Sequence, residues 1–330
     1  MKLVIQIPCY DEEETLAATL NDLPKQIPGI DEIETLVIND GSRDRTTEVA
    51  LDWGVDHIVL FARNKGLARA FLAGLDVALD NGADIIVNTD ADGQYQGRDI
   101  AALVAPVLAG KADIVIGERP IDDTADFSWM KKKLQHIGSY AVRLASATDI
   151  PDAPSGFRAI SRDAALKLNV VNDYSYTLET IVQAGREKIP MTSVKIHTNP
   201  ATRKSRLASS TWRYVRTSML TILRAYLVYK PLKAFGFVSL FPMIPGILLL
   251  IRFLFFYFTT GGGGHVQSLI LACTLIIIGF ITWMIGVLGD AVSANRKILQ
   301  DVQYHERKVY YSRNKDGEAV LREKSRIYYR

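Results

Sequence analysis

The residues best suited to carry chemistry are Asp90 and Asp92, which directly follow the apolar run 85–89. Two carboxylates one residue apart at the end of a strand converge on one point. Such a pair suits a hard divalent cation, magnesium or manganese, that also binds phosphate oxygens. Asp-x-Asp triplets also occur by chance in loops, so the surrounding elements decide whether this pair is a metal site.

Two further apolar runs end in acidic segments. Asp40, in Asn39-Asp40-Gly41-Ser42, can accept hydrogen bonds from a base or ribose, or it can form an Asx turn that caps the next helix. The segment Pro8-Cys9-Tyr10-Asp11-Glu12 ends the first run, and it can equally be a helix start with acidic residues in the first turn. Three acidic strand ends in one sheet favour a shared ligand site.

The elements that position these residues alternate between short β-prone runs and helix-like stretches over about the first 120 residues. The expected strands cover 3–8, 35–40, 57–61, 84–90 and 113–118, and the expected helices cover 13–23, 45–53, 65–79 and 100–110. This alternation predicts an α/β fold with a mostly parallel sheet and helices on both faces. Ligands of such sheets bind at the carboxyl ends of the strands, where all three acidic segments fall.

Two later runs, Ala234–Phe258 and Gln267–Leu288, are almost uninterruptedly apolar. Each exceeds the roughly 20 residues that a helix needs to cross a bilayer, so we expect two transmembrane helices. Lys and Arg flank the pair, whereas the loop between the runs has neither, which predicts that both termini are cytosolic. The chain has only two cysteines, so no disulfide framework is expected.

The remaining segments suggest a division of the chain. We expect a cytosolic catalytic domain over 1–207, an amphipathic interface helix over 208–232, the two spans over 233–290 and a cytosolic tail over 291–330. Residues 127–148 are also basic and amphipathic, and they suit either a membrane interface or ordinary core packing. In the tail, two β-prone runs around Lys315-Asp316-Gly317 predict a β-hairpin.

Taken together, these motifs resemble the family 2 glycosyltransferases of the GT-A fold. The likeness is to the dolichyl-phosphate mannose synthase and polyprenyl-phosphate glycosyltransferase group. It covers about residues 3–207, through the segments IPCYDEEETL, VINDGSRDRT, RNKGLARAFLAGL, NTDADGQY, PSGFRAISR, YTLETIVQAG and RKSRL. The resemblance implies an inverting transferase that uses a nucleotide-sugar donor and a divalent cation, magnesium or manganese.

The resemblance also assigns roles to individual residues. It implies that a nucleotide pocket is bordered by Pro8, Tyr10, Glu12, Asn64 and Gly66, with Asp40 on the base. Asp90 and Asp92 would hold the metal and the diphosphate, with Gln94 beside them.

Three arginines would complete this site. Arg158 would face the active centre, and Arg203 and Arg206 would lie on a loop that closes over the donor phosphates. The alternatives are a structural ion pair for Arg158 and a solvated basic cluster for the other two. Glu179 matches a glutamate that recurs in the group. A functional role for Glu179 and a purely structural helix contact are both open.

Two departures from related enzymes indicate the acceptor. The SGFRA segment has no acid at Ser155 or Gly156 to act as a base, whereas a phosphate acceptor, with a second pKa of about 6, is already ionised at neutral pH. In addition, Gln183 and Arg186 are followed by Glu187, which departs from the Gln-x-x-Arg-Trp signature of processive synthases. Both departures fit a polyprenyl-phosphate acceptor, dolichyl or undecaprenyl phosphate.

We therefore expect transfer from a UDP- or GDP-linked sugar to a polyprenyl phosphate at the cytosolic face of the plasma membrane. The alternatives are transfer to a neutral lipid hydroxyl, such as that of diacylglycerol, and a catalytically idle membrane scaffold. No nucleic-acid partner is expected. The oligomeric state stays open, although anchored relatives often assemble as homo-oligomers.

Overall fold

The computed structural model describes residues 1–120, 146, 148–170, 176–200, 227, 230–260, 266–315 and 326–329. It divides into two compact units, Met1–Ile222 together with Val302–Arg330, and Leu223–Asp301. The helices expected over 127–148 and 208–232 lie almost entirely outside the described residues, as do Arg203 and Arg206.

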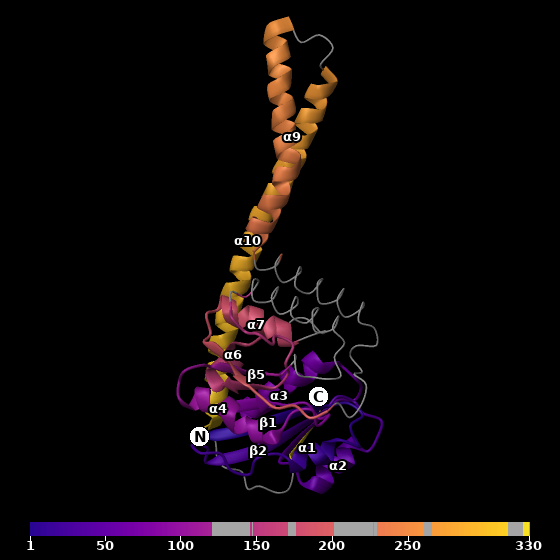
Figure 1. Cartoon of the computed structure of the whole chain (residues 1–330). Coiled ribbons are helices and arrows are strands. Elements are labelled where there is room, and N and C mark those ends of the chain that lie inside the picture. Colours follow the sequence, from indigo (N-terminus) through magenta and orange to yellow (C-terminus); the bar gives the residue numbers. More distant parts are fainter. Residues whose placement is uncertain are drawn as a thin grey trace. The chain divides into compact units, whose positions relative to one another are not determined.

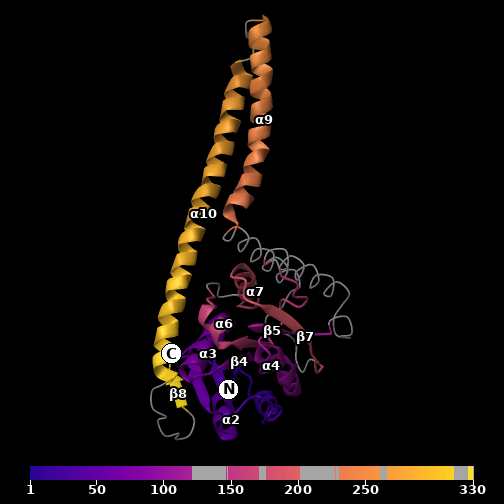
Figure 2. The same ribbon diagram turned by 90° about the vertical axis from the view of Figure 1, so that its left-hand side faces the viewer.

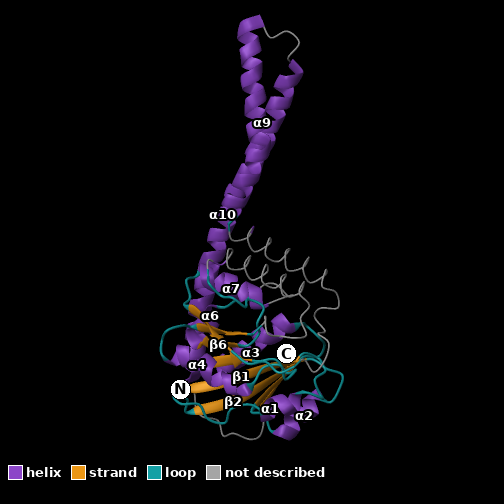
Figure 3. Ribbon diagram, in the orientation of Figure 1, coloured by secondary structure: helices purple, strands orange, loops and turns teal. Residues whose placement is uncertain are grey.

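The first unit is built on one mixed sheet of eight strands in the order β7-β5-β6-β4-β1-β2-β3-β8 (Figure 3). The strands are β1 Lys2–Cys9, β2 Glu32–Asn39, β3 His57–Leu60, β4 Ile85–Asn88, β5 Ile114–Glu118, β6 Arg158–Ser161, β7 Met191–Lys195 and β8 Arg326–Tyr329. All neighbouring pairs are parallel except the two that β6 makes with β4 and β5. The predicted mostly parallel α/β sheet is confirmed.

The central strands are apolar along their whole length because both of their faces are covered. Every residue of β1 after Lys2 is buried. The register places Cys9 beside Asn39, and Gln6 beside Asn88, so β1, β2 and β4 run toward the same edge of the sheet. The three acidic segments that follow these strands therefore leave the sheet at one edge.

Helices cover both faces of this sheet (Figure 1). Successive side chains of β1 point alternately to the two faces, and each face packs against helices. The helices described around this sheet are α1 Leu16–Asn21, α2 Thr46–Trp53, α3 Leu67–Asp80, α4 Ile100–Leu108, α6 Arg162–Lys167 and α7 Tyr176–Arg186. Leu3, Ile5 and Ile7 join the buried cluster that α1 and α4 complete. Gln6 points the other way, toward α3, where its amide donates to the Phe71 carbonyl at 3.5 Å.

The end of the chain is part of this first unit rather than a separate tail. Helix α10 extends over Val266–Lys315, so the first of the two runs expected to form a hairpin is helical. The second run contains β8, which pairs in parallel with β3. The hairpin prediction is wrong because tertiary contacts compete with local pairing. The second run pairs with β3, and in α10 Tyr304 donates to Asp163 at 2.6 Å and Arg307 pairs with Asp76 at 2.7 Å.

The second unit contains α9, Pro231–Thr260, and the first part of α10, which run side by side (Figure 2). Both helices are long and apolar enough to cross a membrane, as predicted, and most of their large apolar side chains are exposed. Small residues allow close packing between the helices. A Cβ added to Gly279 would lie only 2.8 Å from Met243 and 3.1 Å from the Ser239 carbonyl.

Candidate active site

Asp90 lies two residues beyond the end of β4 and is only partly exposed. Burial, and next the neighbouring charge of Asp92, raise the pKa of its carboxyl group to about 7. Within the described part of the chain, no group donates a hydrogen bond to this carboxylate. Its negative charge is therefore poorly solvated and has oxygen lone pairs available for a cation.

The loop after Asp90 is held by a later part of the chain. Asp92 accepts a hydrogen bond from the Gln94 amide at 3.1 Å. The Gln94 carbonyl accepts from the Asn199 amide at 2.8 Å, and the Asn199 side chain donates to the Gly93 carbonyl at 2.9 Å. Asn199 is thus fastened to this loop, and in the sequence it precedes Arg203 by four positions.

These residues fit a divalent cation that is shared with a substrate. Within the described ranges, no group of three or more His, Cys, Asp and Glu side chains could hold a metal ion on its own. Asp90 and Asp92 offer two carboxylates, which leaves other coordination positions for water and phosphate. Magnesium commonly binds in this way, through one or two carboxylates plus substrate phosphates.

Asp40 follows β2 and has different surroundings. Its side chain is 3% exposed, and its two oxygens accept hydrogen bonds from the Lys65 amide at 2.6 Å and the Gly66 amide at 2.9 Å. Burial raises the pKa of this carboxyl group, although the two amides act in the opposite direction. Asp40 thus secures the start of α3, and its contact with a base stays a prediction.

The turn after Asp40 packs against the segment that contains the predicted nucleotide-binding residues Asn64 and Gly66. Gly41 has φ +72°, and a Cβ there would lie 2.4 Å from the Arg63 carbonyl carbon. Only glycine permits this close approach of two backbone segments. Asn64 itself is exposed beside this contact.

The segment after β1 supplies the other predicted nucleotide residues. Pro8 is buried within the strand, whereas Tyr10, just beyond it, is 37% exposed. The Glu12 amide donates to the Thr46 hydroxyl at 2.8 Å, and its carboxylate accepts from the Thr15 hydroxyl at 2.9 Å. This edge of the sheet therefore presents Tyr10 to solvent, while Glu12 fastens the turn to α2.

Arg158 begins β6 with a side chain that is only 1% exposed. Its guanidinium donates to the carbonyls of Ser155 and Ala153, each at 2.8 Å, and to the Thr180 hydroxyl at 2.6 Å. These contacts support the turn before β6, and the positive charge acts on Asp90 through space. A direct contact of Arg158 with substrate stays a prediction.

Arg119 is a neighbour of Asp90 that the sequence analysis missed. It follows β5 directly, and its guanidinium forms a two-pronged pair with Asp152, at 2.8 and 2.9 Å. Burial disfavours its charge, but Tyr95 and Asp152 outweigh this and raise the pKa of Arg119, which stays protonated. Its position at a strand end was a usable signal, because β5 ends at the same edge as β4.

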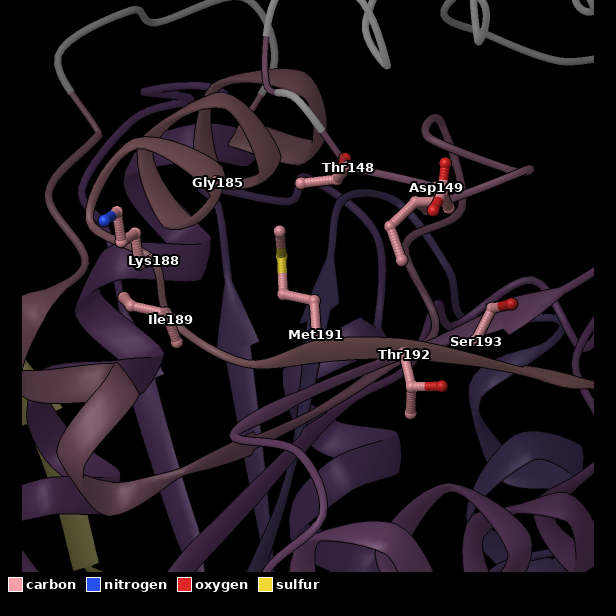
Figure 4. Close-up of a pocket in the computed structure, with 9 residues that line it drawn as sticks. Thr148, Asp149, Gly185, Lys188, Ile189, Met191, Thr192 and Ser193 are labelled. Atoms are coloured by element: carbon pink, nitrogen blue, oxygen red, sulfur yellow. The ribbon is translucent and has the colours of Figure 1, made fainter.

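A cavity of about 430 Å³ lies elsewhere, between the end of α7, the loop Thr148–Ile150 and the start of β7 (Figure 4). Met191 extends from β7 into the space that Thr148 faces from the other side. None of the residues predicted for the active site lines it. Glu179 lies on α7, partly buried, and also does not line this cavity.

Comparison with known proteins agrees with this fold. The model of glycosyl transferase family 2 matches residues 4–168, and this chain belongs to that family. The undecaprenyl-phosphate mannosyltransferase of Micrococcus luteus is 31% identical over 185 residues, which cover 53% of this chain and 74% of the relative. The UDP-N-acetylglucosamine–dolichyl-phosphate N-acetylglucosaminyltransferase of Methanococcus voltae is 29% identical, over 58% and 83% of the two chains.

A solved structure supports the GT-A-like fold. Glucosyl-3-phosphoglycerate synthase from Mycobacterium tuberculosis, in complex with Mn²⁺, UDP-glucose and phosphoglyceric acid, aligns with a TM-score of 0.51 at 18% identity. The alignment covers 67% of this chain and 79% of the synthase. At this identity the likeness concerns the fold alone.

Proposed function

We propose that this protein transfers a sugar from a nucleotide-sugar to a polyprenyl phosphate at a membrane surface. One observation carries the proposal: in a family 2 glycosyltransferase, Asp90 and Asp92 offer carboxylate oxygens at the strand-end edge, and Asp90 has no donor in the described residues. The names of two relatives, from Micrococcus luteus and Methanococcus voltae, support a polyprenyl-phosphate acceptor.

In this proposal Asp90 and Asp92 bind Mg²⁺ or Mn²⁺ together with the donor diphosphate. The cation would neutralise the negative charge that develops on the leaving nucleotide. Protonated Arg119 adds a fixed positive charge that acts on Asp90 through space, and buried Arg158 adds a second one. Preorganised charges of this kind stabilise a leaving anion without reorganisation during the reaction.

The acceptor follows from what the site offers as a base. Ser155 and Gly156, which precede β6 in the SGFRA segment, provide no carboxylate. A lipid phosphate needs none, because it is already an anion at neutral pH. Its oxygen would attack the anomeric carbon opposite the leaving diphosphate and invert the configuration.

The two apolar helices α9 and α10 would anchor the enzyme beside its lipid substrate. The excess of Lys and Arg on both flanks of the pair favours the cytosolic side for both termini, at the plasma membrane. UDP- and GDP-linked sugars are the donors we expect.

The test uses full-length protein in detergent with polyprenyl phosphate, Mn²⁺ or Mg²⁺ and a panel of UDP- and GDP-sugars. We expect release of nucleoside diphosphate and, by mass spectrometry, a phosphate-linked glycolipid. Diacylglycerol in place of the lipid phosphate is the competing acceptor, and a preference for it would reject the phosphate assignment. No release with any donor would reject the transferase activity.

A further inference from the structure

The backbone of Gly156 lies directly against the Asp90 carboxylate. A Cβ added to Gly156 would lie 3.2 and 3.3 Å from the two carboxylate oxygens of Asp90 and 3.0 Å from the Tyr176 hydroxyl oxygen. These distances are shorter than ordinary van der Waals contacts. The space between the three residues therefore holds a glycine hydrogen and nothing larger.

Tyr176 is the rigid side of this contact. Its side chain is 1% exposed and stacks on Phe71, with ring centroids 4.0 Å apart. Asn88 donates to the Tyr176 hydroxyl at 3.0 Å and to the Gly156 carbonyl at 2.9 Å. The Asn88 side-chain oxygen in turn accepts from Gln6 at 2.9 Å. A buried network thus holds both Tyr176 and the Gly156 backbone in place.

Asp90 is held differently, because no hydrogen-bond donor in the described residues reaches its carboxylate. Among the described residues, the Gly156 backbone therefore limits on one side where the two oxygens lie. Gly156 lies between this carboxylate and the Tyr176 hydroxyl, and Asn88 donates both to the Gly156 carbonyl and to that hydroxyl.

We propose that Gly156, Tyr176 and Asn88 form a positioning floor that sets the place of the Asp90 carboxylate for cation binding. This proposal rests on the metal-dependent transfer proposed above, and it adds residues that do not themselves touch the cation. Groups that orient a metal ligand typically change metal affinity 10- to 100-fold when they are mutated.

Gly156→Ala tests the floor directly. The added methyl group must displace a neighbour by a few tenths of an ångström, and Tyr176 is fixed by stacking and hydrogen bonding. The Asp90 carboxylate is therefore the group that moves. We expect about 10-fold weaker Mn²⁺ affinity in the presence of saturating UDP or GDP, measured by electron paramagnetic resonance of free Mn²⁺ on the full-length protein. Saturating Mn²⁺ should restore much of the lost kcat.

A second variant separates positioning from general damage to the fold. Tyr176→Phe removes the atom nearest to the added methyl group, so the double variant Gly156→Ala/Tyr176→Phe regains space. We expect the double variant to bind Mn²⁺ more tightly than Gly156→Ala alone. If the substitutions only loosen the fold, the double variant would instead bind Mn²⁺ more weakly than either single variant, and the proposal would be overturned.

Gly236→Ala on α9 is the matched control, because nothing lies within 4 Å of the Cβ that it adds. It should bind Mn²⁺ like the wild type. Wild-type Mn²⁺ affinity in Gly156→Ala would overturn the positioning floor and leave the proposed function standing. No nucleotide-dependent Mn²⁺ binding by the wild type would overturn both.

Discussion

Asp40 and Asp90 follow equivalent strands of one sheet, yet their surroundings oppose each other. Both come after apolar strands, and burial raises the pKa of both carboxyl groups. Two backbone amides at the start of α3 bind the oxygens of Asp40, whereas Asp90 has no donor within the described residues. The oxygens of Asp40 are therefore used within the fold, and the oxygens of Asp90 stay available for a ligand.

The difference shows what a strand-end carboxylate needs before it can bind a cation. A buried carboxylate whose oxygens are satisfied by amides has little left to offer a metal. Asp90 is balanced instead by the more distant charges of Arg119 and Arg158, which lower its pKa without occupying its oxygens. The contrast leads to three predictions, which run from the largest effect to the smallest.

Asp90→Asn should abolish transfer while leaving the fold intact. An amide keeps the shape of the side chain but has only one oxygen and no charge for the cation. We expect sugar transfer to fall about 1,000-fold, the upper range for the loss of one charge-stabilising group. The thermal midpoint without metal should stay at or above that of the wild type at pH 8, because an unfavourable buried charge is gone. Retention of more than a tenth of the transfer rate would contradict the role of Asp90.

The sequence was sufficient to predict the sheet and its functional edge. Uninterrupted apolar runs such as β1 and β4 are typical of buried parallel strands, and the chain leaves each of them at the carboxyl end. The two long apolar helices were predictable for a similar reason, since length and hydropathy alone identify α9 and the first part of α10. The Asp90/Asp92 pair could be identified because it follows such a strand directly.

What the sequence could not supply came from contacts between distant segments. The partners of Asp40 are backbone amides some 25 positions away, which no side-chain pattern reveals. The end of α10 and β8 were misread as a hairpin because β-prone tyrosines favour strands locally, whereas Arg307 finds partners on α3 and α6. Tertiary contacts override local preference in such segments.

Asp40→Asn should produce the complementary result. An asparagine can accept from only one of the two amides, and its own NH₂ group would face the other. A buried amide left unpaired costs about 1–3 kcal/mol, so the thermal midpoint should fall by several degrees. The loop 63–66 would shift, and we expect KM for the donor to rise about 10-fold with a smaller change in kcat.

Asp52→Asn, on the exposed surface of α2, is the control for this variant. It should leave both the thermal midpoint and KM unchanged. A stable Asp40→Asn protein with normal KM would show that the two amides do not depend on this carboxylate. Asp40 would then not be needed to hold the start of α3, and the contrast with Asp90 would no longer stand.

The smallest effect concerns how stability depends on pH when no metal is present. The pKa of Asp90 is about 7 in the folded protein, compared with an ordinary value of 3.8. Between these values the folded state binds a proton that the unfolded state has released, so stability falls as pH rises from about 4 to 7. Asp90→Asn lacks this dependence. Relative to that variant, the wild type should lose about 2–5 °C in thermal midpoint across this interval, since partial exposure weakens the effect.

Mn²⁺ with UDP or GDP sharpens this last comparison, because a cation that binds the ionised carboxylate stabilises the folded protein by mass action. The ligand should therefore raise the wild-type midpoint increasingly as pH rises toward 7 and leave Asp90→Asn almost unaffected. At saturating nucleotide, Asp40→Asn should keep the rise of this response with pH, because the carboxylate that it removes is bound by two backbone amides and is not a cation ligand. Equal responses of all three proteins would mean that the cation binds elsewhere, and that the open oxygens of Asp90 serve another purpose.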